Sequence, residues 1–454
     1  MKKNAAAIIF AFCFLSVFCF SLGFLWAQDG ASQSPDAQNS RQQANQDQNS
    51  QNSQNQNSQD QNSQNQNDAG DQLAAQDQQS EQSTDGAQSS DEQSSGAQAG
   101  SPQTAFTRSP SIVLTAPLTG HWSVFGAESK LGASLAMKTI SSGFELLSLD
   151  EQDPGLADEL ASKNPPLVAI GHLFESSVEL VAPYYLKTDT PVLLPFIDNP
   201  ALDVLGPTFL RLLPGPDKQG LRLASEVPRN KSVGKVYIFE GPDPANKALA
   251  ESFREALIHP QSPPPTKANP KPSKPRALAE KAVVTVKIES LQDIAAVKDI
   301  KGAAQDWVLL ALPVRLALKV APVLGESKLK RSTFIAPFSL SLREVGAAYL
   351  AVGIRNLRVA VPVENVDNAK NKTFRDFSRR HTQLFRREPS WASVMAYDAT
   401  TLASLASSSE EGPTAYLTDP ELVHTGAAGR YSRSEGDWPF SVIKLDADKL
   451  VLLP

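Results

Sequence analysis

The chain has 454 residues, of which 41% are hydrophobic and 20% are charged, and its formal net charge is −6. This length and apolar content suffice for at least one large hydrophobic core. The charge is uneven: residues 28–105 hold eleven acids and a single base, whereas the rest is nearly neutral. The concentrated basic face that nucleic-acid binding requires is therefore not expected.

Residues 1–27 are typical of an export signal. Lys2 and Lys3 precede an apolar run over residues 5–26, and the small residue Ala27 follows it. The run is also long enough to span a bilayer, so an uncleaved N-terminal anchor is the alternative. Both interpretations place the bulk of the chain outside the cytoplasm.

The two cysteines, Cys13 and Cys19, both lie inside this apolar run. Phe12 and Phe18 precede them, and a lipid-attachment cysteine would follow a small residue. We therefore expect no lipid anchor. After export the chain has no cysteine, which excludes a disulfide and a thiolate metal site.

Residues 28–107 form a Gln/Asn/Ser-rich segment of low complexity. It holds almost no large apolar side chain, so burial cannot offset the entropy cost of ordering it. We expect a disordered tether with a root-mean-square reach on the order of 50 Å. Self-association of its Gln/Asn-rich repeats is the alternative role.

From residue 111 onward, short apolar strands alternate with amphipathic helices. We expect strands at 112–115, 144–149, 167–171 and 191–194, with helices at 127–140 and 176–187. A second series predicts strands at 235–239, 283–288, 307–312 and 333–336, with helices at 246–257, 291–300 and 314–324. Such alternation is typical of parallel sheets with helices on both faces, here in two lobes.

A proline- and lysine-rich stretch, residues 259–276, interrupts the second series. Proline at this density excludes helix and sheet and predicts an extended surface loop. It is interpreted either as an insertion of the kind that surface loops tolerate, or as an arm that docks a partner.

Several spaced motifs resemble those of the leucine/isoleucine/valine-type periplasmic binding proteins. They are PLTGHWSVFG at 117–126, VAIGHL at 168–173, NPAL at 199–202, LRLLPGPDKQG at 210–220, EPS at 388–390 and AYDA at 396–399. The resemblance covers residues 111–454. It implies an α/β fold in which two Rossmann-like lobes are joined by a hinge that the chain crosses three times. Lobe 1 would comprise 108–226 and 362–427, and lobe 2 would comprise 227–361 and 428–454.

The same resemblance implies where a ligand would bind, at the carboxyl ends of the strands facing the cleft. Phe125 keeps the aromatic of the family's first loop, with Trp122 beside it. Glu175 stands where the family has a carboxylate-binding serine at a helix start, and Ser176 and Ser177 follow it.

The other positions implied to hold an amino acid are also altered. Asp198 replaces a threonine, and Phe338 replaces the glutamate that anchors the ligand ammonium. Glu175 is interpreted either as a helix cap or as a receiver of cations, and Asp198 either as a turn residue or as a second cleft acid. If both acids face the cleft, they favour a cationic or amine-bearing ligand, on which Phe338 could stack.

Enzyme motifs are missing from the sequence. There is no GxSxG elbow and no phosphate-binding loop. The five histidines show no ligand spacing, and for His121 and His172 packing or solvation is favoured over a metal pair. We therefore expect no enzyme, no catalytic residue, no metal and no cofactor.

The resemblance implies a periplasmic solute-binding component of an ABC-type importer. It would close on a small ligand, either amino-acid-like or cationic and amine-bearing, and dock on permease subunits in the inner membrane. The alternative is a degenerate binding fold that acts as a tethered scaffold or regulator of an envelope complex. Residues 28–107 or 259–276 would then contact an envelope protein.

Overall fold

A computed structural model describes residues 110–140, 143–228, 233–260, 276–364, 371–434 and 439–454. The predicted signal or anchor, the tether over 28–107 and most of the proline-rich loop lie outside these residues. Across the described ranges, no helix combines the length and the apolar content that crossing a bilayer requires.

The first sheet has five parallel strands in the order β2-β1-β3-β4-β5. They are β1 (Ser111–Ala116), β2 (Glu145–Asp150), β3 (Val168–Gly171), β4 (Val192–Leu194) and β5 (Phe209–Arg211). The strands predicted near 112, 144, 167 and 191 are confirmed. The short strand β5 was not predicted, because three residues are too few to show a recognisable strand pattern.

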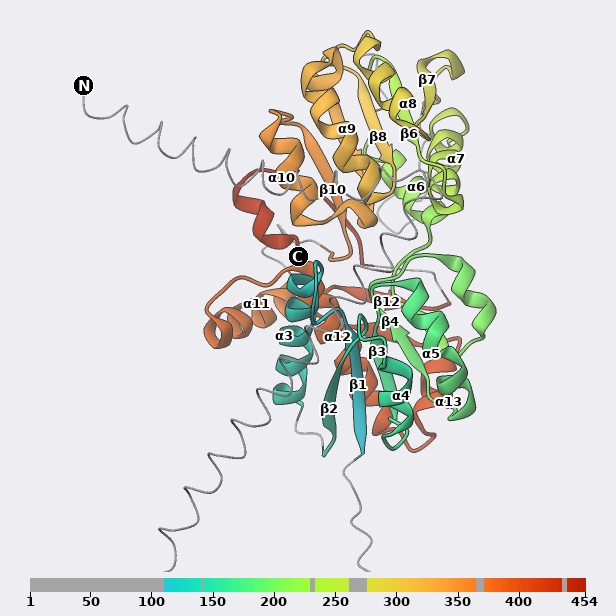
Figure 1. Cartoon of the computed structure of the whole chain (residues 1–454), viewed down its shortest axis with the longest axis vertical. Coiled ribbons are helices and arrows are strands. Elements are labelled where there is room, and N and C mark those ends of the chain that lie inside the picture. Colours follow the sequence, from blue (N-terminus) through green and yellow to red (C-terminus); the bar gives the residue numbers. More distant parts are fainter. Residues whose placement is uncertain (1–109, 141–142, 229–232, 261–275, 365–370, 435–438) are drawn as a thin grey trace, which may run out of the picture. The chain divides into compact units, whose positions relative to one another are not determined.

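Helices cover both faces of this sheet (Figure 1). They include α3 (Ser123–Thr139), α4 (Leu156–Ala161), α5 (Glu175–Lys187) and α12 (Trp391–Ser407). Ile112 and Ile170 belong to the core cluster that contains side chains of α3 and α12. Val113 and Ala169 belong to a separate cluster with α4 and α5. This alternation arises because successive strand residues point to opposite faces.

The second sheet has six strands in the order β13-β10-β9-β8-β6-β7. They are β6 (Val236–Glu240), β7 (Val283–Lys287), β8 (Trp307–Ala311), β9 (Thr333–Ala336), β10 (Leu357–Val361) and β13 (Ser441–Lys444). The first four confirm the predicted second series. Strand β13 is antiparallel to β10, and the other pairs are parallel.

The helices of this region are α6 (Pro216–Ala224), α7 (Pro244–Ile258), α8 (Leu291–Ala296), α9 (Val314–Glu326) and α10 (Arg343–Ala351). Helix α6 packs on α7, and Gly220 permits the contact because a Cβ there would meet the backbone of Leu249 and Phe253. Thus α6 packs on a second-sheet helix although the expected boundary at 226 assigns it to lobe 1. The lobe boundaries stay a prediction.

Other elements complete the described part of the chain. The remaining helices and strands are α11 (Lys372–Phe385), α13 (Pro413–Thr418), β11 (Val423–Thr425) and β12 (Arg430–Ser432). Short 3₁₀ turns are η1 (Pro200–Leu205), η2 (Glu280–Ala282), η3 (Val297–Asp299), η4 (Lys328–Arg331), η5 (Phe338–Leu340) and η6 (Asp448–Leu452).

The chain passes between the two sheets three times. It leaves the first sheet after β5, and it returns after β10, because α12 packs on α3 and on β3. It leaves again after β12, because β13 joins β10. This connectivity is the three-crossover arrangement that the resemblance implied.

Helices α3 and α12 cross at Gly132. A Cβ at Gly132 would overlap the backbone of Ser393, so only glycine allows this approach. The buried Glu128 carboxylate on α3 accepts hydrogen bonds from the hydroxyls of Ser390 (3.2 Å) and Ser393 (2.8 Å), and it pairs with Arg387 (2.7 Å). The return of the chain to the first sheet is therefore fixed by close packing and by a buried charge with partners.

The buried carboxylate of Asp398 ties α12 to the turn between β11 and β12. Its oxygens accept hydrogen bonds from the N–H groups of Ala427 (2.7 Å) and Ala428 (2.6 Å). Burial raises the pKa of Asp398 to about 7, although these two bonds act in the lowering direction. Asp398, the acid of the AYDA motif, therefore has a structural role.

Replacing Gly132 with alanine should lower the free energy of unfolding by about 1–3 kcal/mol, because α3 and α12 must separate to admit the methyl group. Gly143→Ala is the matched control, since a Cβ there meets no atom within 4 Å. Chemical denaturation of both variants measures the difference. Equal stability of the two would contradict the close crossing.

Asp398 should also make stability depend on pH. Its pKa in the folded chain lies above the value near 4 of an unfolded aspartate, so the folded state binds the proton more tightly. The contribution is full below about pH 4 and is lost as the pH rises to about 7, a change on the order of a few kcal/mol. In Asp398→Asn, the fall in unfolding free energy across this range should be smaller. An unchanged pH profile in this variant would show that Asp398 does not titrate in this way.

Candidate functional site

The predicted site residues lie where strands end, on both sheets. Trp122 and Phe125 follow β1, and Asp198 follows β4. Glu175, Ser176 and Ser177 open helix α5 after β3, whereas Phe338 follows β9 of the second sheet. These residues thus follow the carboxyl ends of strands, and their role in a ligand site remains a prediction.

The start of α5 is already bonded to a carboxylate of the chain, Glu151. Its oxygens accept hydrogen bonds from the N–H groups of Leu173 (3.0 Å) and Phe174 (3.3 Å) and from the hydroxyl of Ser177 (2.7 Å). Burial raises the pKa of Glu151 to about 7, and these three bonds partly offset the effect. Sequence reasoning missed Glu151. The available signal was its position directly after β2, at the same sheet edge as the motif GHL.

His172 in the GHL motif is a packed residue. It is fully buried, and its Nδ1 lies 2.9 Å from Ser177 Oγ and its Nε2 lies 3.4 Å from the Tyr185 hydroxyl. Burial lowers the pKa of His172 to about 3, so the imidazole is neutral. Gly171 before it has φ 111° and abuts the Thr115 carbonyl, which explains the glycine of the motif.

His121 is exposed and contacts the ring of Trp122 edge-on, at 5.1 Å between ring centroids. Within the described ranges, no group of three or more His, Cys, Asp or Glu side chains is placed to hold a metal ion.

Glu175 and Ser176 are exposed, in contrast to the buried Ser177. Glu175 is the first residue of α5, and its Oε2 accepts a hydrogen bond from Asn199 Nδ2 (2.7 Å). The helix dipole favours an acid at this position. Asn199 in turn caps η1, since its Oδ1 accepts from the N–H of Ala201 (2.9 Å).

Asp198 is partly exposed and lies close enough to Glu175 for their charges to interact. Burial is the main cause that raises the pKa of Asp198, and the charge of Glu175 raises it further. Asp198 Oδ2 accepts from Gln219 Nε2 (2.6 Å), and Gln219 Oε1 accepts from the N–H of Phe338 (3.2 Å). The buried Gln219 therefore links two predicted site residues that follow strands of different sheets.

The two phenylalanines are used for packing. Phe125 is 2% exposed, and its ring centroid lies 4.9 Å from that of Phe196 and 5.4 Å from that of Trp391. Phe338 is 3% exposed, and its ring centroid lies 4.8 Å from that of Phe440. Neither ring presents an open face to solvent. Trp122 is partly exposed and contacts Phe174 edge-on, at 6.1 Å between ring centroids.

A second cross-connection starts at Trp391, the first residue of α12. Its indole Nε1 donates a hydrogen bond to the carbonyl of Ser341 (2.9 Å), which follows η5 of the second-sheet region. Side chains of the chain itself thus bridge the two regions at Trp391 and at Gln219.

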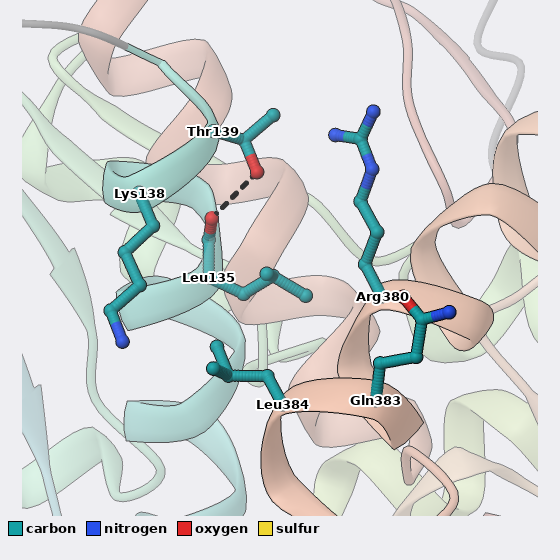
Figure 2. A pocket seen from close by; sticks show the side chains of 6 residues that line it. All are labelled: Leu135, Lys138, Thr139, Arg380, Gln383 and Leu384. Atoms are coloured by element: carbon teal, nitrogen blue, oxygen red, sulfur yellow. Dashed lines mark hydrogen bonds between the residues drawn. The ribbon is translucent and has the colours of Figure 1, made fainter.

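Three cavities found among the described residues do not include the predicted site. The largest, about 520 Å³, lies between α3 and α11 and is shown in Figure 2. The others measure about 10 and 20 Å³ and are lined partly by Trp391 and by Asp398, respectively.

Comparison with known proteins gave no match to a protein-family model and no match to a curated protein. Many solved structures do match. One is an ABC transporter substrate-binding protein from Desulfitobacterium hafniense in complex with Leu, at 17% identity and a TM-score of 0.56, covering 74% of this chain and 98% of that one.

Two other solved structures are similar to the same extent. The branched-chain amino acid transporter substrate-binding protein LivJ from Streptococcus pneumoniae, in complex with isoleucine, is 16% identical with a TM-score of 0.54, covering 72% of this chain and 92% of that one. A solute-binding protein from R. palustris in complex with benzoate is 15% identical with a TM-score of 0.54, covering 75% and 94%. With its two sheets and three crossings, the chain therefore has the fold of the type I, leucine-binding-like periplasmic binding proteins.

Proposed function

We propose that the chain is an exported, periplasmic solute-binding protein that serves as the substrate-binding component of an ABC-type importer. The observation that carries this proposal is the pair of α/β regions, joined by three crossings, with charged side chains at the strand ends. Similar solved structures with this fold hold leucine, isoleucine or benzoate. The N-terminal segment would be a cleaved signal or a retained anchor.

The proposed mechanism is closure of the two regions around a small ligand. A ligand shifts the equilibrium only by its difference in affinity for the open and closed forms. Contacts made from both sides of the cleft supply that difference, and permease subunits in the inner membrane would recognise the closed form.

We propose a cationic, amine-bearing or neutral ligand. Glu151, Glu175 and Asp198 surround the beginning of α5 and the end of β4, and Glu151 already accepts from the N–H groups that precede the helix. An anionic ligand would meet like charge there. A cation would compensate Glu175 and Asp198, and an apolar portion could contact the exposed part of Trp122.

A second candidate function is a tethered scaffold or regulator of an envelope complex. The observation that favours it is the bonding of the predicted site residues to one another. Asp198 is bonded to Gln219, and Phe125 and Phe338 are packed against aromatic neighbours. A ligand would have to replace these contacts, whereas a scaffold would keep them.

We infer a non-enzymatic role, although one buried trio contains the residue types of a hydrolase. In a nucleophilic triad the serine donates to the histidine, and the histidine to the acid. Here the Ser177 hydroxyl lies between Glu151 and His172 and is only 5% exposed. Because the serine lies between the acid and the histidine and is almost fully buried, we interpret the three residues as packed structural groups.

A thermal-shift screen of the exported chain tests the ligand proposal. Amino acids, amines, short peptides and aromatic acids form the panel. A ligand at a hundred times its dissociation constant should stabilise the folded state by about 2.7 kcal/mol. We expect stabilisation by amines and not by aromatic acids. No shift across the panel, together with cross-linking to an envelope protein in membranes, would favour the scaffold.

The paired variant Glu175→Gln with Asp198→Asn should weaken binding of any amine found in the screen by tenfold or more, since two compensating charges are lost; about 1.4 kcal/mol accounts for each tenfold. Glu179→Gln with Asp158→Asn is the matched control, because both acids are exposed on α5 and α4. Calorimetric titration measures both variants. Unchanged affinity in the first pair would show that these acids do not contact the ligand.

A further inference from the structure

The groove between α3 and α11 is lined by none of the predicted ligand-site residues, although α3 also carries Phe125. Its volume is about 520 Å³, and it opens widely to solvent. Figure 2 shows Leu135 of α3 and Leu384 of α11 turned into the gap between the two helices, with Lys138 and Arg380 pointing in different directions on either side of it.

Both walls of the groove are held by α12. Helix α3 crosses α12 closely at Gly132, and the buried face of α11 places Phe377 against Tyr397 of α12 (4.8 Å) and against His381 (5.6 Å). The His381 ring is also anchored through Nδ1, 3.0 Å from the Arg387 carbonyl. The groove is therefore bounded by packed helices and needs no rearrangement to receive a partner.

The groove has cations and no acid. Lys138 and Arg380 are exposed on opposite walls, and neither forms an ion pair with any described residue. Two bases nearby do have partners, since Arg379 pairs with Asp376 (3.0 Å) and Arg387, just beyond α11, pairs with Glu128. The potential in the groove is consequently positive, and it attracts negative charge.

The groove also has an apolar component. Leu384 is 45% exposed although α11 buries its other face on α12, and the nearly buried Leu135 lies across from it. Leu384 can bury further apolar surface only if something covers the groove. Thr139 and Gln383 add hydrogen-bonding groups at the rim.

We propose that this groove docks an acidic segment of a partner protein, with carboxylates on Lys138 and Arg380 and an apolar side chain between Leu135 and Leu384. Cations on two walls suit successive carboxylates along a chain better than one compact anion, which binds best where donors converge. The inference does not depend on the ligand of the strand-end site and holds for either candidate function.

The test uses the full exported chain and a short fluorescein-labelled peptide of glutamates around one central leucine. Fluorescence anisotropy should show saturable binding that weakens as salt is raised. Lys138→Glu with Arg380→Glu should weaken binding about tenfold or more, because each contact changes from attraction to repulsion. Leu384→Ser should weaken it independently of salt.

Lys247→Glu with Arg331→Glu is the matched control, since it makes the same charge change on exposed bases of α7 and η4. It should leave binding within about twofold, and the melting temperatures of all variants show that they fold. Absence of saturable binding would overturn the proposal, as would equal losses in the two charge-reversal pairs. Preference for anionic lipid vesicles over the peptide, lost in the Lys138 and Arg380 pair, would instead identify a membrane surface and overturn it as well.

Discussion

The first sheet depends on a helix that the chain supplies only after most of the second sheet is built. Helix α12 follows β10, yet it covers one face of β1 and β3 and crosses α3 where Gly132 lets the backbones meet. Buried groups reinforce this contact, with Glu128 holding the start of α12 and Asp398 holding its middle to the β11–β12 turn. Helix α12 also carries Trp391 and supports α11. The Trp391–Ser341 hydrogen bond, the groove between α3 and α11, and the core between α3, α12 and the first sheet therefore all depend on the crossing of α3 and α12.

The alternation of strands and helices could be predicted because each element has its own apolar pattern. Strands such as β1 and β6 are buried on both faces and give short continuous apolar runs that are easy to recognise. Helix α3 begins four residues before the expected start, since its first turn has no capping side chain to mark it. Strand β13 was not predicted, because an edge strand that pairs on one side shows only weak alternation.

The chemistry of the candidate site was less predictable than its location. The motifs put Glu175, Asp198 and Phe338 at strand ends correctly, because connectivity alone fixes that edge. Which group each side chain meets depends on contacts between distant segments: Gln219 reaches both Asp198 and the Phe338 N–H, and Glu151 reaches the residues before α5. No local pattern encodes such contacts. Because of these contacts, a ligand would have to compete with hydrogen bonds inside the protein. The two candidate functions differ in whether those internal hydrogen bonds are replaced or kept.

The pairing of β13 with β10 has a consequence for how the protein matures. While the chain emerges from its N-terminus, β10 remains an unpaired sheet edge until the final stretch of sequence arrives. The first sheet likewise lacks half of its cover until residues beyond 390 are present. The second sheet is therefore completed last, and a nascent or C-terminally clipped chain would present an open β edge to its neighbours.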